Sequence, residues 1–96
     1  MAVIRLVRFT VEPTRADDMI ARRADLVAAT RRLYPGLVEA RLTRVDEQTW
    51  LDLWHWESMD HAEDAIRGAA DIPGAAVAFE LTSNLSAEFT EVVDER

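Results

Sequence analysis

One carboxylate stands among three tryptophans in the segment Thr49–Trp56, which has the residue types best suited to chemistry in this chain. Side chains of one parity share a face of a strand, so Asp52 points to the same side as all three tryptophans. An unpaired carboxylate enclosed by aromatic rings could remove a phenolic proton as a general base. The alternative is an ion pair with Arg41 or Arg5, which would keep Asp52 ionised and chemically quiet.

The tryptophans have two possible roles, substrate contact and packing. Trp56 could stack on a flat aromatic substrate or donate its indole N–H to a substrate oxygen, and the alternative is a core residue between strand and helices. Trp54 is a second candidate for substrate contact. Its alternative role is packing or a dimer contact, and the same role is expected for Trp50. Each buried tryptophan removes about 150–250 Å² from water, so this strand must be covered on both faces.

Other site chemistries find little support in the composition. The chain has no cysteine and two histidines, and no carboxylate spacing completes a metal site, so no bound metal is expected. The net charge of −7 disfavours nucleic acid or an anionic membrane as partner. No apolar run approaches the length of a membrane span, and the first residues look like a strand rather than a signal sequence. We therefore expect a soluble, cytoplasmic protein with one domain over residues 1–96.

The hydrophobic spacing predicts an alternation of strands and helices. Apolar residues at helical spacing follow Thr14, a candidate N-cap, and stop at Pro35-Gly36, while Ser58 is the candidate N-cap of the next helix. The predicted strands are 3–12, 37–45, 49–56 and 87–94, and the predicted helices are 14–34, 58–70 and 71–85. The helices are expected to bury Met19, Ile20, Ala24, Val27, Leu33, Tyr34, Ala62, Ala65, Ile66, Ala69, Ala76, Phe79 and Leu81.

This order predicts an α+β, ferredoxin-like βαββααβ fold. Two right-handed crossovers and one hairpin give an antiparallel sheet with strand order 4-1-3-2, in which the two most apolar strands are central. Helices can cover one face of that sheet, and nothing else in the chain can cover the other. We expect a second copy to cover it, which makes the protein an obligate homodimer packed sheet to sheet.

The chain resembles the antibiotic biosynthesis monooxygenase family of the dimeric α/β-barrel superfamily. The likeness rests on the element order, on Pro35-Gly36 before the second strand, and on Trp56-Glu57-Ser58 between the third strand and the next helix. Phenol-oxygenating members tend to carry an Asn where this chain has Asp52. Haem-degrading members carry an Asn and a His where this chain has Val7 and Ile66, which argues against haem degradation.

The resemblance implies a pocket between sheet and helices and a set of residues that line it. By the family pattern, Arg5, Val7 and Phe9 look into this pocket, where Arg5 could hold a phenolate or, alternatively, cap the rim of the sheet. His61 could carry protons at the pocket rim, or it could serve only the start of its helix. His55 lies on the face opposite Trp56.

The function implied by the resemblance is oxygenation of a phenolic, quinol or polycyclic aromatic substrate by dioxygen, without a metal or organic cofactor. Asp52 and Trp56 would be its catalytic residues. Two other readings of the same residues stay open: a non-catalytic dimeric module that binds an apolar ligand, and an isomerase or cyclase acting on an aromatic polyketide.

Overall fold

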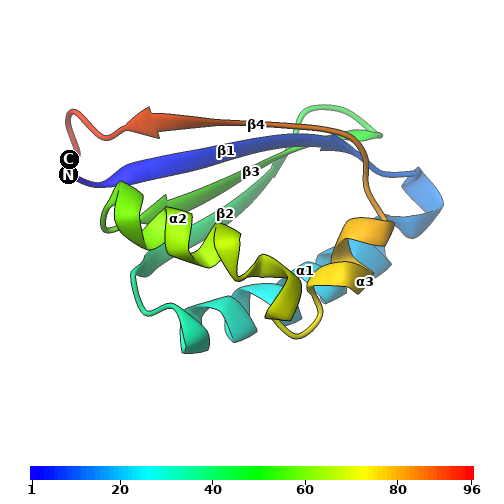
Figure 1. Ribbon diagram of the computed structural model, residues 1–96. Helices are drawn as coiled ribbons and strands as arrows, with labels where there is room; N and C mark the ends of the chain where they lie inside the picture. Colours follow the sequence, from blue (N-terminus) through cyan, green and yellow to red (C-terminus); the bar gives the residue numbers. More distant parts are fainter.

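A computed structural model describes all residues, 1–96, as one α+β unit with four strands and three α-helices (Figure 1). Two short 3₁₀ helices, η1 and η2, precede α1 and α3. In chain order the elements are β1 (Val3–Thr10), η1 (Pro13–Arg15), α1 (Ala16–Leu33), β2 (Leu37–Arg44), β3 (Thr49–Trp56), α2 (Met59–Arg67), η2 (Ala69–Asp71), α3 (Ala75–Glu80) and β4 (Ser83–Glu91). No helix is long and apolar enough to cross a membrane.

The four strands form one sheet in the order β2-β3-β1-β4, and β1 pairs antiparallel with both β3 and β4. The predicted ferredoxin-like order with β1 and β3 at the centre is confirmed. In the register of β1 with β3, Val7 lies opposite Asp52 and Arg5 lies opposite Trp54. These residues therefore share one face of the sheet.

A bulge in β2 decides which side chains of this strand reach that face. Leu37 pairs with Trp56, but the next pairing joins Glu39 to His55, so one extra residue lies between them. A single inserted residue exchanges the two faces for the rest of a strand. Arg41 consequently pairs with Leu53 and points away from Asp52.

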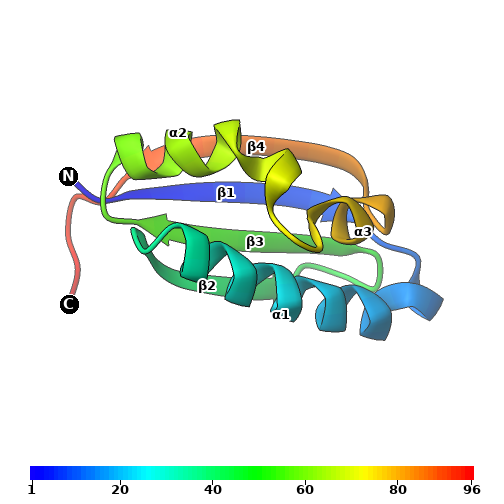
Figure 2. The ribbon, with the colours of Figure 1, turned by 60° about the horizontal axis from the view of Figure 1, so that its bottom comes forward.

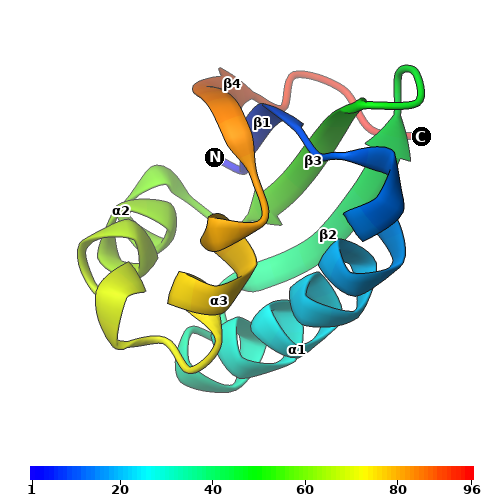
Figure 3. The ribbon, with the colours of Figure 1, turned by 90° about the vertical axis from the view of Figure 1, so that its right-hand side faces the viewer.

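All three helices lie on the same face of the sheet, as the views from below and from the end show (Figures 2 and 3). The helix α1 runs along β2, and α2 lies over β1 and β4 (Figure 2). One core cluster packs Val3 and Trp56 against α2, and a second packs Phe9 and Trp50 against Met19 of α1. These clusters occupy opposite ends of the central strand pair and leave its middle for a cavity.

The buried face of α1 differs from the predicted one. Its buried residues are Ala16, Met19, Leu26, Ala29 and Thr30, whereas Ile20, Ala24 and Leu33 are exposed. Thr14 lies within η1 and makes no capping hydrogen bond. The prediction placed Ile20, Ala24 and Leu33 inside and missed Leu26 and Ala29, because the buried stripe of α1 runs through residues 19, 26 and 30.

The helix α3 is shorter than predicted and β4 begins earlier. Gly74 has φ 87°, a left-handed conformation that glycine adopts without strain, and α3 ends at Glu80. It buries Ala75 and Ala78, while Ala76 and Phe79, predicted to be inside, are exposed. The predicted α2 holds better: Ser58 accepts a hydrogen bond from the His61 amide, and Ala62 and Ala65 are buried.

Two glycines allow α2 to lie close to the end of α1. A β-carbon on Gly36 would come within 2.4 Å of Cδ2 and 2.8 Å of Cβ of His61. A β-carbon on Gly68 would come within 1.9 Å of the Tyr34 hydroxyl oxygen. The Pro35-Gly36 pair therefore ends α1 and also provides the space in which the His61 ring packs.

We expect Gly36→Ala to destabilise the protein by about 1–3 kcal/mol, the usual cost of overpacking, because the His61 side chain must leave its place. Urea denaturation measures this change. The double variant Gly36→Ala/His61→Ala serves as control and should recover part of the loss. A Gly36→Ala protein as stable as the wild type would contradict the close contact.

Candidate functional site

A cavity of about 140 Å³ lies between the sheet and the three helices. Its floor consists of side chains from β1 and β3, and its walls come from α1, α2 and α3. Fourteen of its 19 lining residues are hydrophobic. The floor residues are Arg5, Val7, Phe9, Asp52, Trp54 and Trp56. The structure thus places six of the seven predicted site residues around one space.

Asp52 is buried at the centre of this floor and forms an ion pair with Arg23 of α1. Its two carboxylate oxygens accept hydrogen bonds from Nε and Nη2 of Arg23, each at 2.8 Å. The side chains of Asp52 and Arg23 are only 8% and 16% exposed. This paired, two-point geometry is the strongest form of a guanidinium–carboxylate contact.

The prediction that Asp52 pairs with Arg41 or Arg5 is wrong, because its partner is Arg23. The bulge in β2 turns Arg41 to the other face, where it bonds Glu39. Arg5 shares the face of Asp52 but makes no ion pair with it. Arg23 was not among the predicted site residues, although it is spaced by four residues from Met19 and by three from Leu26, on the buried stripe of α1.

The three tryptophans have different surroundings. Trp56 is 3% exposed, packs against Ala62 and Ala65, and lines the cavity. Trp54 is half-buried in the lining, and the Arg23 guanidinium lies 5.9 Å from its ring centre. Trp50 lies outside the cavity in the core beside Phe9, with its buried indole N–H unpaired.

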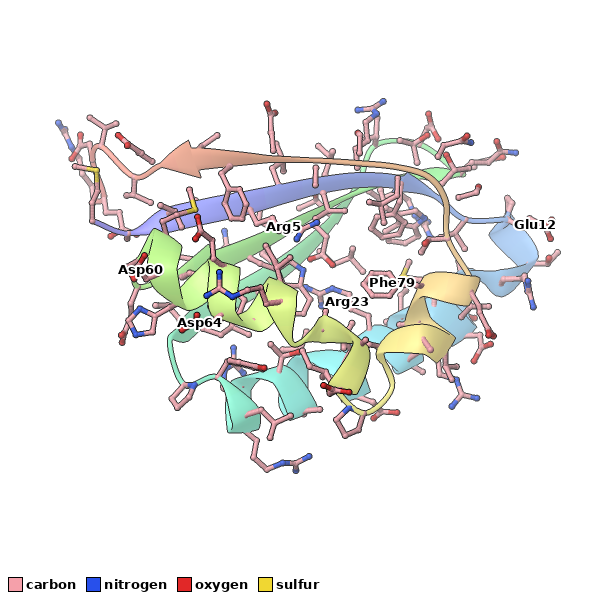
Figure 4. All side chains as sticks on the ribbon, in the orientation of Figure 1. Arg5, Glu12, Arg23, Asp60, Asp64 and Phe79 are labelled. Atoms are coloured by element: carbon pink, nitrogen blue, oxygen red, sulfur yellow. The ribbon has the colours of Figure 1, made fainter.

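Arg5 is the second arginine of the cavity and has no acidic partner. Its Nε is buried without a hydrogen-bond partner, and its guanidinium lies 5.9 Å from the ring centre of Phe89 on β4. Burial lowers the pKa of Arg5 from its ordinary value, because the charged form loses hydration. Figure 4 shows Arg5 and Arg23 in the space between sheet and helices, with the labelled acids Asp60 and Asp64 on α2.

The histidines do not reach the cavity. His61 lies against Gly36, and its Nδ1 lies 2.6 Å from the Ser58 hydroxyl at the start of α2. Its placement fits the helix-start alternative, and it is absent from the cavity lining that was predicted for it. His55 faces the opposite side of the sheet, 3.7 Å from Glu95. No cluster of three His, Cys, Asp or Glu side chains could hold a metal ion.

The mouth of the cavity is apolar. Three lining residues are well exposed: Ile66 at 39%, Phe79 at 51% and Leu85 at 45%. They come from α2, α3 and β4, so the opening lies between the two short helices and the edge strand. Its size suits one aromatic ring, since a cavity of about 150 Å³ holds benzene, and a larger ligand would extend through the mouth.

Comparison with known proteins identifies relatives by structure alone. No family model matches the chain, and no curated protein matches it. SnoaB, a cofactor-independent oxygenase from Streptomyces nogalater, superposes with a TM-score of 0.76 at 21% identity, over 98% of this chain and 95% of that one. A candidate antibiotic biosynthesis monooxygenase from Caulobacter crescentus superposes with a TM-score of 0.78 at 22% identity, over 97% and 91%.

The chain has the fold of the antibiotic biosynthesis monooxygenases. A candidate monooxygenase from Bordetella bronchiseptica extends the likeness, with a TM-score of 0.73 at 22% identity over 96% of this chain and 97% of that one. The resemblance inferred from Trp56-Glu57-Ser58 is thereby confirmed at the level of the fold. Identities this low establish the fold, and the chemistry must be argued from the residues of this chain.

We expect Asp52→Ala to cost about 3–5 kcal/mol of stability, because it leaves Arg23 as an unpaired buried charge. Urea denaturation measures the loss. The matched control is Asp18→Ala, which breaks the exposed Asp18–Arg22 pair on α1, the helix that carries Arg23. The side chains of Asp18 and Arg22 are 54% and 51% exposed. That variant should lose less than about 1 kcal/mol. Equal losses in the two variants would contradict a buried Arg23–Asp52 pair.

Proposed function

We propose that the protein is a monooxygenase that acts on a small phenol or quinol with dioxygen and without a cofactor. The observation that carries the proposal is an apolar cavity with a buried Arg23–Asp52 pair and the indole of Trp56 on its floor. The fold shared with SnoaB, named as a cofactor-independent oxygenase, supports it. The volume of about 140 Å³ favours a single aromatic ring over a polycyclic substrate held wholly inside.

The proposed reaction needs no reductant because the substrate supplies the electrons. Loss of a proton from an electron-rich phenol or quinol gives a carbanion-like anion, which transfers electrons to O₂ as a C–O bond forms. Cleavage of the O–O bond then leaves one oxygen atom in a carbonyl group and releases the other as water. In the keto tautomer of the phenol the reacting ring carbon is a CH₂ group, and the balance is CH₂ + O₂ → C=O + H₂O, which converts the phenol into a quinone.

In this proposal, Asp52 accepts the phenolic proton or its hydrogen bond. A carboxylate offers about four acceptor positions, and the two hydrogen bonds from Arg23 leave others for a substrate hydroxyl. The adjacent guanidinium stabilises the negative charge that develops on the substrate. Trp56 lines the cavity, and its indole N–H would donate to the substrate oxygen. Trp54 and Phe9 would border the aromatic ring of the substrate.

We expect oxygen consumption when the protein is incubated with a panel of monocyclic phenols and hydroquinones, measured with an oxygen electrode. Trp56→Phe should lower kcat/KM by about 10-fold or more, the value of one hydrogen bond to a charged group. Asp52→Asn should lower it by about 10²–10⁴-fold, the usual contribution of a positioned base. Trp50→Phe, a buried change outside the cavity, is the control and should keep the wild-type rate.

The two alternatives predict different outcomes of the same incubation. Conversion of substrate under nitrogen would identify an isomerase or cyclase. Binding without conversion would identify a ligand-binding module, an alternative favoured by the engagement of both Asp52 oxygens with Arg23. Unchanged oxygen consumption in both Asp52→Asn and Trp56→Phe would contradict the proposed mechanism.

We also propose that the protein is a homodimer in which the uncovered sheet face meets a second copy. The helices leave this face bare, and its centre carries Leu6 and Leu53, which pair with each other across β1 and β3. An apolar centre on an uncovered sheet face, here flanked by Glu88 and Arg41 on the neighbouring strands, is a candidate interaction surface. Face-to-face packing of two such sheets buries both apolar centres.

We expect a dimer in sedimentation velocity at micromolar concentration and a shift to monomer in Leu53→Arg, because two charges would face each other across a dry interface. The control is Ala28→Arg on the exposed side of α1, which should stay dimeric. A wild-type monomer at this concentration would contradict the proposal.

A further inference from the structure

Arg5 is a cation without a counter-ion inside an apolar cavity. It forms no hydrogen bond to a side chain and no ion pair, and its Nε is both buried and unpartnered. Buried charges in proteins are normally paired. Arg5 is partly buried and its guanidinium lies beside the Phe89 ring without meeting an acid, so it is free to pair with an anion that enters the cavity.

The charges of the cavity lining do not balance. Beside its 14 hydrophobic residues, the lining has two threonines and three ionised side chains: Arg5, Arg23 and Asp52. Arg23 and Asp52 neutralise each other. One positive charge remains, in a protein whose net charge is −7. Arginine does not lose its proton in proteins, so this charge persists at any working pH.

We propose that the ligand of this cavity is a hydroxylated aromatic carboxylate whose carboxylate group binds Arg5. One uncompensated positive charge matches a monoanion, and the planar guanidinium pairs with a carboxylate through two parallel hydrogen bonds. The apolar walls and the volume of about 140 Å³ suit a single ring.

The sheet register places the two polar contacts at opposite ends of such a ring. Arg5 and Val7 are neighbours on one face of β1, and Val7 lies directly opposite Asp52. Arg5 is thus displaced from Asp52 by two residues along the strands, about 7 Å. A ring with its carboxylate at Arg5 and its hydroxyl at Asp52 would occupy the space between them. The contact of the ligand hydroxyl with Asp52 rests on the proposed function.

Binding of 4-hydroxybenzoate and of its neutral methyl ester, measured by calorimetry under nitrogen, tests the assignment. We expect the wild type to bind the acid at least about 10-fold more tightly than the ester, the value of one charge-assisted hydrogen bond. Arg5→Met should abolish this preference, and Arg5→Lys should retain part of it. Arg8→Met, which changes an exposed arginine on the other face of β1, is the matched control and should keep it.

Equal binding of acid and ester by the wild type would overturn the proposal, as would an unchanged preference in Arg5→Met. Thermal denaturation checks that Arg5→Met is folded. The two proposals fail separately. Oxygen consumption with neutral phenols, without a preference for the acid, would overturn the Arg5 assignment alone. A preference for the acid that depends on Arg5, without oxygen consumption, would overturn the proposed function alone.

Discussion

The buried ion pair between Arg23 and Asp52 is the interaction on which the site depends. It joins the middle of α1 to the middle of β3 across the layer between helices and sheet. The pair holds the two layers in one orientation at a point where apolar packing is interrupted by the cavity. It also gives the cavity a fixed acceptor and donor side by side, which a purely apolar core would lack.

The three tryptophans of β3 have different roles along the strand. Trp50 packs into the core beside Phe9 at one end, and Trp56 packs against α2 at the other. Between them, Asp52 and Trp54 border the cavity, so packed ends support an open centre. A site of this kind stays preorganised because its charged groups lie on β1, β3 and α1 rather than on loops. The opposite face of the same strand carries Leu51, Leu53 and His55, away from the helices.

The sequence predicted the fold well because local signals were strong and mutually consistent. Pro35-Gly36 ends α1, Ser58 begins α2, and the period of two in 49–56 defines β3. The cavity floor was also predictable, since strand parity places Arg5 with Val7 and Phe9 and the family resemblance assigned their shared face to the pocket. The partner of Asp52 was not, because one bulged residue in β2 reversed the orientation of Arg41. Arg23 reaches across from another layer, and such a contact has no periodic signal of its own.

We propose that the cavity supports oxygenation in which the substrate itself reduces dioxygen. Isotope labelling under ¹⁸O₂ tests this proposal, with a monocyclic hydroquinone or phenol and protein freed of metals by chelation. One ¹⁸O atom is expected in each product molecule and the second in water. Product that carries oxygen from H₂¹⁸O instead, or that forms equally without dioxygen, would contradict it.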